Sequence, residues 1–292
     1  MDSSHQTQLP NRRRDIQGLR ALAVLGVIAF HAGLPVSGGF AGVDVFFVIS
    51  GYVITNMLRR EWDNTGSIRI RSFFRRRFLR LTPALALLIA FTFLISGFVL
   101  YADQQWIAMQ TGFGALFLVA NLVIARNTGG YFDSPAEMNP LLNTWSLSVE
   151  EQFYILFPIV ILLGFLVSRR FPQLRSFNLF AVFLLGLVSF ASMMLSTGLV
   201  AGLAVPSWLN FYSPIPRVWE FAVGSALAFG AHRFFRVPRF FAYTLVSCGL
   251  LSILISFFAF NEVTPWPSIW TLLPIIGATL VLLGGQGSLG EH

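Results

Sequence analysis

"LRALAVLGVIAFHAG", residues 19–33, is the centre of an apolar run long enough to form a membrane helix, yet it carries an arginine near one end and a histidine near the other. Arg20 and His31 are eleven residues apart, which is about three helical turns, so both side chains project from nearly the same face. The rise per residue places them roughly 16 Å apart along the axis. One membrane helix therefore presents two ionisable groups at two depths.

The composition of the whole chain agrees with a membrane location. Hydrophobic residues make up 55% of the 292 positions and charged residues 11%, and the mean hydropathy is +0.69. These values lie outside the range of soluble globular proteins and predict an all-α, polytopic membrane protein. The first apolar run is followed by many similar runs and lacks a small-residue cleavage site, so we expect it to be retained and not removed as a signal peptide.

Cysteine and histidine are too few and too scattered for a disulfide framework or a metal site. Cys248 is the only cysteine and lies in an apolar stretch. The four histidines are at positions 5, 31, 232 and 292, without the close spacing of metal ligands. We therefore predict no bound metal.

The basic residues follow a pattern that indicates membrane topology and not nucleic-acid binding. The net charge is +7 and all twenty basic residues are arginine. Eighteen of them form four clusters: Arg12, Arg13, Arg14 and Arg20; Arg59, Arg60, Arg69, Arg71, Arg75, Arg76, Arg77 and Arg80; Arg169, Arg170 and Arg175; Arg233, Arg236 and Arg239. Arg126 and Arg217 stand apart. Clusters of this kind between apolar runs are typical of cytoplasmic loops.

Nine apolar runs are candidates for membrane segments. They are residues 17–34, 39–58, 81–101, 112–125, 145–168, 178–200, 217–231, 240–260 and 269–284. All four arginine clusters become cytoplasmic if the short run 112–125 enters the membrane and returns as a re-entrant segment. We therefore expect a transmembrane helix bundle with one re-entrant segment, a cytoplasmic N-terminus, and loops at 102–111 and 126–144 on the same outer side.

Two alternatives stay open for each ionisable group of the first helix. Arg20 is either an anchor at the cytoplasmic interface or part of a site. His31 is either a buried histidine bonded to a neighbouring helix or a reactive group, and the cost of ionisable residues inside a membrane favours the second. In "GGFAGVDVFFVISGYVIT", residues 38–55, we assign the glycines to helix packing, whereas Asp44 could orient and stabilise an imidazole that acts as a base.

The loop from Arg59 to Arg80 is the densest positive patch of the chain. From Ile70 onward the apolar residues follow helical spacing with most arginines elsewhere around the wheel, which predicts an interfacial amphipathic helix. Its arginines could bind anionic lipid headgroups or form a cytoplasmic polyphosphate site.

Two further stretches carry polar groups inside apolar surroundings. "NTWSLSVEEQFYILFP", residues 143–158, contains adjacent carboxylates that point about 100° apart on a helix, so Glu150 and Glu151 should do different jobs. Trp145 and Tyr154 lie nearby. In "PRVWEFAVG", residues 216–224, Arg217 and Glu220 stand at i and i+3, where an ion pair is the plain explanation.

Together these motifs resemble the membrane acyltransferase-3 family, in the branch that includes O-antigen acetylases. The resemblance rests on the Arg20-to-His31 helix, the glycine-rich segment, "FFRRRFLRLTPAL", "NTWSLSVEEQFY" and "RVWEFAVG". It implies a bacterial inner-membrane enzyme that moves an acyl group, commonly acetyl, from cytoplasmic acetyl-CoA to a hydroxyl of an extracytoplasmic or lipid-linked glycan such as O-antigen, lipopolysaccharide, exopolysaccharide or peptidoglycan. Acetyl-CoA is then a donor substrate, with no permanently bound cofactor, and membrane lipids are further partners.

The resemblance also implies roles for individual residues. The family's essential residues of the first helix match His31 and Arg20, its R-x-x-R motif matches Arg77 and Arg80, and its acidic motif matches Glu150. Family members continue with further membrane helices and many carry a periplasmic SGNH-type domain, so we expect residues 1–292 to be an acyltransferase domain that is incomplete at its C-terminus, without that domain.

The resulting hypothesis has CoA phosphates on Arg77 and Arg80, helped by Arg75 and Arg76, and the pantetheine passing Arg20 toward His31. His31 then deprotonates the glycan hydroxyl or takes the acyl group itself, with Asp44 or Glu150 stabilising the imidazolium. Trp145, Glu151, Tyr154, Arg217 and Glu220 are candidates for substrate binding. The alternatives are a transporter or flippase that uses the same buried groups, and an inactive fragment.

Overall fold

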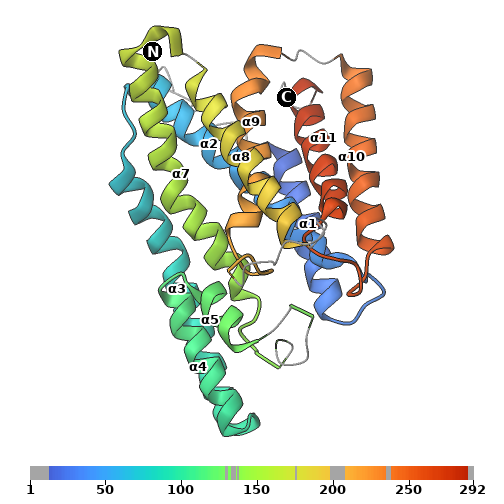
Figure 1. Cartoon of the computed structure of the whole chain (residues 1–292). Helices are drawn as coiled ribbons and strands as arrows, with labels where there is room; N and C mark the ends of the chain where they lie inside the picture. Colours follow the sequence, from blue (N-terminus) through green and yellow to red (C-terminus); the bar gives the residue numbers. More distant parts are fainter. Residues whose placement is uncertain are drawn as a thin grey trace, which may run out of the picture. The chain divides into compact units, whose positions relative to one another are not determined.

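The computed structural model describes residues 13–128, 131–132, 136, 138–174, 176–197, 208–234 and 238–288. These residues form helices and connecting turns without a strand, which confirms the all-α fold (Figure 1). The helices are α1 (Arg14–His31), α2 (Gly42–Thr65), α3 (Ile70–Val99), α4 (Ala102–Leu116), α5 (Ala120–Asn127), α7 (Thr144–Arg170), α8 (Phe177–Ser196), α9 (Val218–Phe234), α10 (Arg239–Ala259) and α11 (Leu272–Ser288). Arg12, Arg175 and Arg236 of the predicted clusters lie outside the described residues.

Within the described part of the chain, six helical segments are long and apolar enough to cross a membrane: Gly39–Thr65, Ile70–Val99, Thr144–Arg170, Phe177–Ser196, Arg239–Ala259 and Ile269–Gln286. The chain is thus a multi-pass membrane protein. The predicted runs 17–34 and 217–231 also form helices, but α1 carries more charge, and α9 has 17 residues, fewer than the shortest of these segments.

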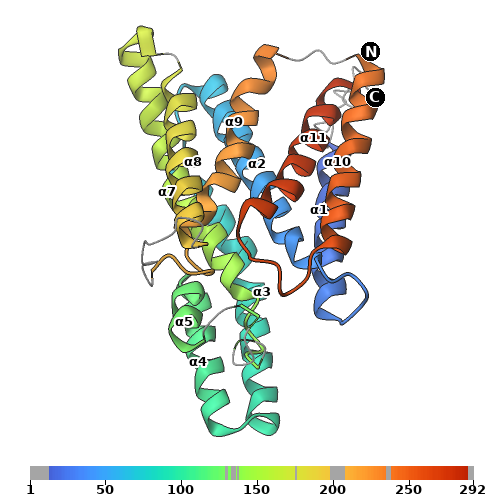
Figure 2. The ribbon, with the colours of Figure 1, turned by 45° about the vertical axis from the view of Figure 1, so that its right-hand side comes forward.

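The chain divides into two compact units, and the first contains residues 1–49, 230–261 and 272–292. In this unit α10 and α11 run side by side (Figure 2). Glycine permits the close approach of its elements. A Cβ on Gly39 would lie 2.2 Å from the carbonyl oxygen of Gly26 on α1, so only glycine fits there. The assignment of the glycine-rich segment to packing is confirmed.

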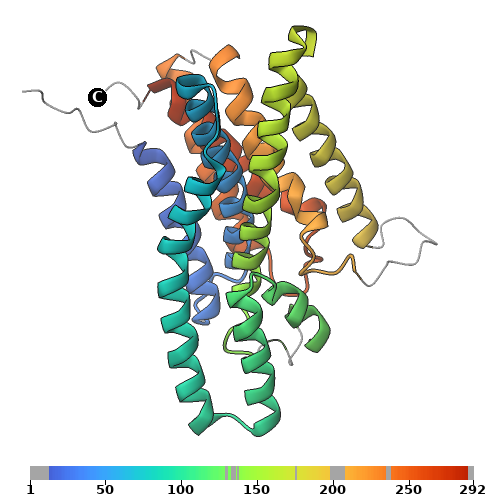
Figure 3. The same ribbon diagram turned by 90° about the vertical axis from the view of Figure 1, so that its left-hand side faces the viewer.

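The second unit contains residues 50–229 and 262–271. Here α3 and α4 lie antiparallel and side by side (Figure 3), α5 packs on α4 and α7, and α7 packs on α8. Gly51 of α2 touches the backbone of α9, since a Cβ on Gly51 would lie 2.0 Å from the carbonyl oxygen of Phe221.

The predicted loop from Arg59 to Arg80 is mostly helical, which corrects the sequence interpretation. α2 continues to Thr65 and α3 begins at Ile70, so only residues 66–69 connect them. The expected helix from Ile70 is confirmed as the first part of α3, which continues through Pro83 to Val99. Phe73 is buried and Arg77 is paired with α7, so these turns pack on the bundle; their position at the membrane interface stays a prediction.

The run 112–125 is not one helix. α4 ends at Leu116 and α5 begins at Ala120, and Leu118 between them has a φ of 61°, a left-handed conformation that reverses the chain. α5 has eight residues and is about 12 Å long, too short to cross the hydrocarbon. The expected loop at 102–111 is also wrong, because these residues belong to α4.

The start of α4 meets the segment that precedes α7. The Nε2 atom of Gln104 lies 3.4 Å from Sδ of Met138, and Asn139 donates to the hydroxyl of Thr111 at 2.8 Å. The chain therefore returns, after α5, alongside α4. Both features agree with a segment that enters and returns; the side of the membrane on which it does so stays a prediction.

Candidate functional site

His31 is the last residue of α1 and its side chain is exposed. Its Nδ1 atom lies 2.8 Å from the carbonyl oxygen of Val27, one turn earlier. Because a carbonyl oxygen only accepts, Nδ1 carries the hydrogen and the lone pair of the neutral ring is on Nε2. Because the ring is exposed, the alternative of a buried histidine is wrong. The role of His31 as a reactive group stays a prediction.

Asp44 and Arg20 belong to the same unit as His31. Asp44 lies in the first turn of α2 and is completely buried. A carboxylate is favoured there because the amide groups of a helix N-terminus carry partial positive charge. Arg20 is half-buried on α1, which is compatible with both alternatives stated for it.

The second unit contains an ion pair between α3 and α7. Arg77 donates to Glu151 through Nη2 at 2.5 Å and through Nε at 3.2 Å, and its guanidinium lies 3.6 Å from the ring centre of Tyr154. Glu151 is 8% exposed at its side chain. Arg77 is thus held on one side by a carboxylate and on the other by an aromatic face, and this contact fixes α3 against α7.

Glu150 has different partners from its neighbour, as the helical geometry predicts. Its Oε1 atom accepts hydrogen bonds from the hydroxyls of Ser50 on α2 and Tyr154 on α7. Glu150 itself is half-buried. Glu150 is thus oriented by two hydroxyl groups, while Glu151 is paired with an arginine.

The remaining arginines of α3 face outward. Arg75, Arg76 and Arg80 are exposed, and Arg76 donates to the hydroxyl of Ser72 at 2.6 Å. The four arginines predicted to bind phosphate therefore fall into two groups: Arg77 contacts α7, and the other three are accessible to a ligand.

Arg217 and Glu220 form the predicted ion pair, at 3.2 Å, with exposed fractions of 1% and 0%. The guanidinium of Arg217 lies 4.9 Å from the ring centre of Phe211 and 5.6 Å from that of Trp145. The Tyr131 ring stacks on Phe211 at 4.7 Å. This arginine is enclosed by aromatic faces where the segment before α9 meets the start of α7.

Tyr131 completes this aromatic cluster and stays neutral. Burial raises the pKa of its phenol well above the usual value. Its hydroxyl donates to Oδ1 of Asn143 at 3.3 Å. The hydroxyl is therefore a hydrogen-bond donor at any physiological pH.

A polar network ties the α4–α5 turn to α7. Gln152 donates to the carbonyl oxygen of Leu118 at 2.8 Å and to Oδ1 of Asn121 at 2.9 Å. The hydroxyl of Ser148 accepts from the backbone N–H of Ala120 at 3.2 Å. These bonds satisfy the polar groups of a left-handed turn and of a helix start, so the turn is fixed by the same helix that carries Glu150 and Glu151.

The structure brings Glu150, Glu151, Tyr154 and Arg77 together, and it brings Trp145, Arg217 and Glu220 together, all in the second unit. Trp145, Glu151, Tyr154, Arg217 and Glu220 are buried in these internal contacts; their role in substrate binding stays a prediction. Sequence reasoning missed Ser50, Asn121 and Phe211. Ser50 and Asn121 are polar residues within apolar runs, and this was the signal that could have identified them.

Comparisons with known proteins place these features in context. The profile of an acyltransferase domain matches residues 13–289. The chain is 39% identical over 215 residues to the peptidoglycan O-acetyltransferase OatA of Listeria monocytogenes, covering 73% of this chain and 33% of that protein. A Staphylococcus aureus (strain COL) protein, provisionally named an O-acetyltransferase, is 33% identical over 86% of this chain and 41% of its own length. No solved structure matches.

A Bacillus subtilis protein, provisionally named a peptidoglycan O-acetyltransferase, is 34% identical over 77% of this chain and 34% of its own length. The aligned part of this chain thus spans about a third to two fifths of these relatives.

Proposed function

Because this chain belongs to the acyltransferase-3 family of membrane acyltransferases, we propose that it transfers an acetyl group from cytoplasmic acetyl-CoA to a hydroxyl of an extracytoplasmic glycan, with peptidoglycan as the first candidate. The observation that carries the proposal is the extent of the family match, residues 13–289, which includes every predicted site residue. The name of the Listeria relative supports a peptidoglycan acceptor. A bacterial inner membrane and a cytoplasmic N-terminus are parts of the same proposal.

The exposed arginines of α3 support the donor side of the reaction. CoA carries three phosphate groups, and guanidinium groups bind phosphate oxygens in bidentate geometry. Arg80, Arg75 and Arg76 are exposed near one end of α3. In this proposal they hold the CoA phosphates, while Arg77 holds α3 in place through Glu151.

The hydrogen bond from His31 to Val27 supports the chemical step. Nε2 of His31 takes the proton of the glycan hydroxyl as its oxygen attacks the thioester carbonyl. The C–S bond breaks, the CoA thiolate leaves and collects the proton, and the glycan ester remains. The alternative route has Nε2 attack the thioester first and pass the acetyl group to the hydroxyl afterwards. The stabilisation of an imidazolium by Asp44 or by Glu150 stays a prediction.

The test is transfer of radiolabelled acetate from acetyl-CoA. Membranes that contain the chain are incubated with the labelled donor, glycan is recovered, and acetate released by mild base is counted. The proposal expects base-labile label on glycan for the native chain and background label for His31→Ala. Trapping of labelled protein after the glycan is omitted would select the two-step route.

The transporter alternative gives a different result in the same assay. A flippase without chemistry would leave no ester on the glycan, and neither would an inactive fragment. Absence of label, with the chain inserted in the membrane and able to bind acetyl-CoA, would therefore refute the proposed activity.

A further inference from the structure

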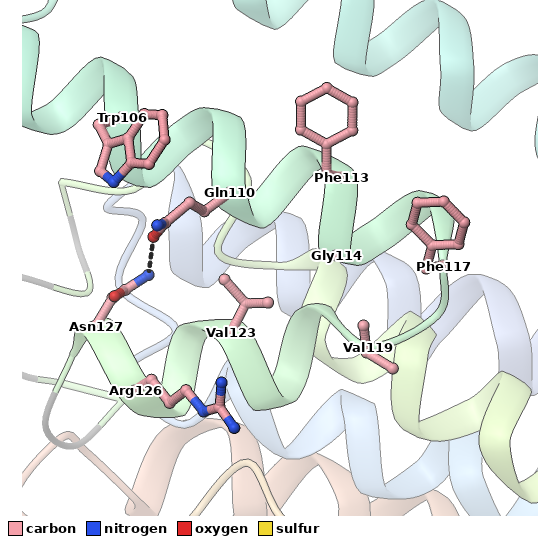
Figure 4. A pocket seen from close by; sticks show the side chains of 9 residues that line it. All are labelled: Trp106, Gln110, Phe113, Gly114, Phe117, Val119, Val123, Arg126 and Asn127. Carbon is pink, nitrogen blue, oxygen red and sulfur yellow. Dashed lines mark hydrogen bonds between the residues drawn. The ribbon is translucent and has the colours of Figure 1, made fainter.

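The hairpin of α4 and α5 carries a surface hollow that the proposed chemistry does not use. Its volume is about 500 Å³ and it opens to the surface of the second unit (Figure 4). Gly114 sets the spacing of the two helices, since a Cβ there would lie 2.9 Å from a methyl group of Val123. The hollow is therefore a consequence of how closely α5 returns along α4.

Aromatic rings and one cation line this hollow. Figure 4 shows Trp106, Phe113 and Phe117 on the α4 side, and Val123 and Arg126 on the α5 side. The three aromatic side chains are more than half exposed. Exposed aromatic residues, and tryptophan above all, are typical of the membrane–water interface, where a membrane protein contacts lipid headgroups.

Arg126 gives the hollow its charge. It is exposed and belongs to none of the four arginine clusters. Beside it, Asn127 donates to Oε1 of Gln110 at 2.9 Å, which links α5 to α4 (Figure 4). The wall thus offers a guanidinium and two amides next to an apolar face, a combination that suits an amphipathic anion.

We propose that this hollow binds the phosphate of a lipid headgroup at Arg126, with the lipid chain lying against Phe113, Phe117 and Val123. Bilayer phospholipids and lipid-linked glycan carriers share this chemistry. A carrier bound here would lie beside the α4–α5 turn, which Gln152 of α7 holds through the carbonyl oxygen of Leu118. Gln152 is two residues from Glu150. Lipid binding needs no acyl transfer, so its failure would leave the proposed function intact.

The experiment measures lipid retained by the full chain in detergent, by native mass spectrometry. The probes are phosphatidylglycerol, diacylglycerol with the same chains, and a polyprenyl phosphate. The variants are Arg126→Gln, Val123→Trp to fill the hollow, and Arg239→Gln as a control that removes an exposed arginine from α10. A photoactivatable phosphatidylglycerol identifies the labelled peptide.

We expect Arg126→Gln to lower phosphatidylglycerol retention about ten-fold, as loss of a charge-assisted hydrogen bond does, and Arg239→Gln to leave it unchanged. Val123→Trp should also lower it, and the crosslink should map to residues 102–127. Displacement by polyprenyl phosphate identifies a glycan carrier, and its failure to displace identifies a bilayer phospholipid. Equal retention of diacylglycerol, or equal losses in Arg126→Gln and Arg239→Gln, would overturn the proposal.

Discussion

The end of α1 and the contact between α3 and α7 place their ionisable side chains in opposite environments. His31 is exposed at the last residue of its helix and bonded to the backbone of that helix. Glu151 is buried and paired with Arg77 of another helix. In the proposed function, removal of His31 deletes the reacting atom, whereas removal of Glu151 leaves Arg77 without its carboxylate. The proposal therefore assigns His31 to chemistry, and the structure assigns Glu151 to helix packing.

The sharpest test of this contrast is His31→Ala. We expect transfer to fall by about 10²-fold or more, the usual contribution of a general base, while thermal unfolding in detergent is unchanged because the side chain is exposed. His31→Asn keeps a donor for the carbonyl oxygen of Val27 and should be equally inactive. Retained transfer in either variant, or a large loss of stability, would break the comparison.

The matching test in the second unit is Glu151→Gln. Loss of one partner of a fully buried ion pair costs about 3–5 kcal/mol. The side chain of Arg77 is 27% exposed, so the free energy of unfolding should fall by less than that amount. The double variant Arg77→Met with Glu151→Leu should recover much of the loss, because an apolar pair needs no charge compensation.

Glu150→Gln is the control for this prediction, since its partners are hydroxyls and it is half-buried. We expect a loss of about 1 kcal/mol, the typical value of one hydrogen bond. Equal losses at the two positions would show that the two carboxylates do not have separate roles.

A smaller effect is expected at Arg80, where the change alters a ligand contact and no packing. Arg80→Gln should weaken acetyl-CoA binding about ten-fold at low salt and less at high salt, where the native contact is itself screened. Arg80→Lys keeps the charge but loses the bidentate geometry of the guanidinium group. Its affinity for acetyl-CoA should therefore lie between those of Arg80→Gln and the native chain. Unchanged affinity with weaker membrane association would assign this face to lipid headgroups.

The smallest expected effect is a difference in thiol labelling between two single-cysteine variants. The cysteines replace Asp103 and Met138 in a background without Cys248. The contact of Gln104 with Met138 places both positions at one level, so a membrane-impermeant thiol reagent should label them alike in cells whose outer layers are permeable. Label at one position with protection at the other would require a crossing between them, and would refute the predicted re-entrant segment. Ser134, in the same predicted loop, lies outside the described residues.

Much of the fold follows from local signals. Apolar length predicts the helices, and the spacing of Arg20 and His31 places them on one helix, as the structure confirms. The spacing of Arg217 and Glu220 predicts their ion pair. Each of these inferences needs only neighbours within about one to three turns of a helix.

The pairing of Arg77 with Glu151 could not be predicted in this way, because 74 residues separate them and nothing local specifies a partner. The motif alone assigned Arg77 to phosphate. The turn at Leu118 was also hidden, since leucine carries no preference for a left-handed conformation. It persists because Gln152 holds its carbonyl oxygen from a distant helix.

The separation of 74 residues between Arg77 and Glu151 also determines the order in which the two partners enter the membrane during synthesis. At about 5–20 residues per second, α3 precedes its acidic partner by roughly 4–15 s. During that interval the translocon handles a helix that carries an uncompensated arginine, at an insertion cost of about 2.5–3.5 kcal/mol if the charge reaches the centre of the bilayer. The long apolar part of α3 after Pro83 must therefore provide the free energy for inserting α3. When α7 is inserted, it packs against a helix that is already in the membrane.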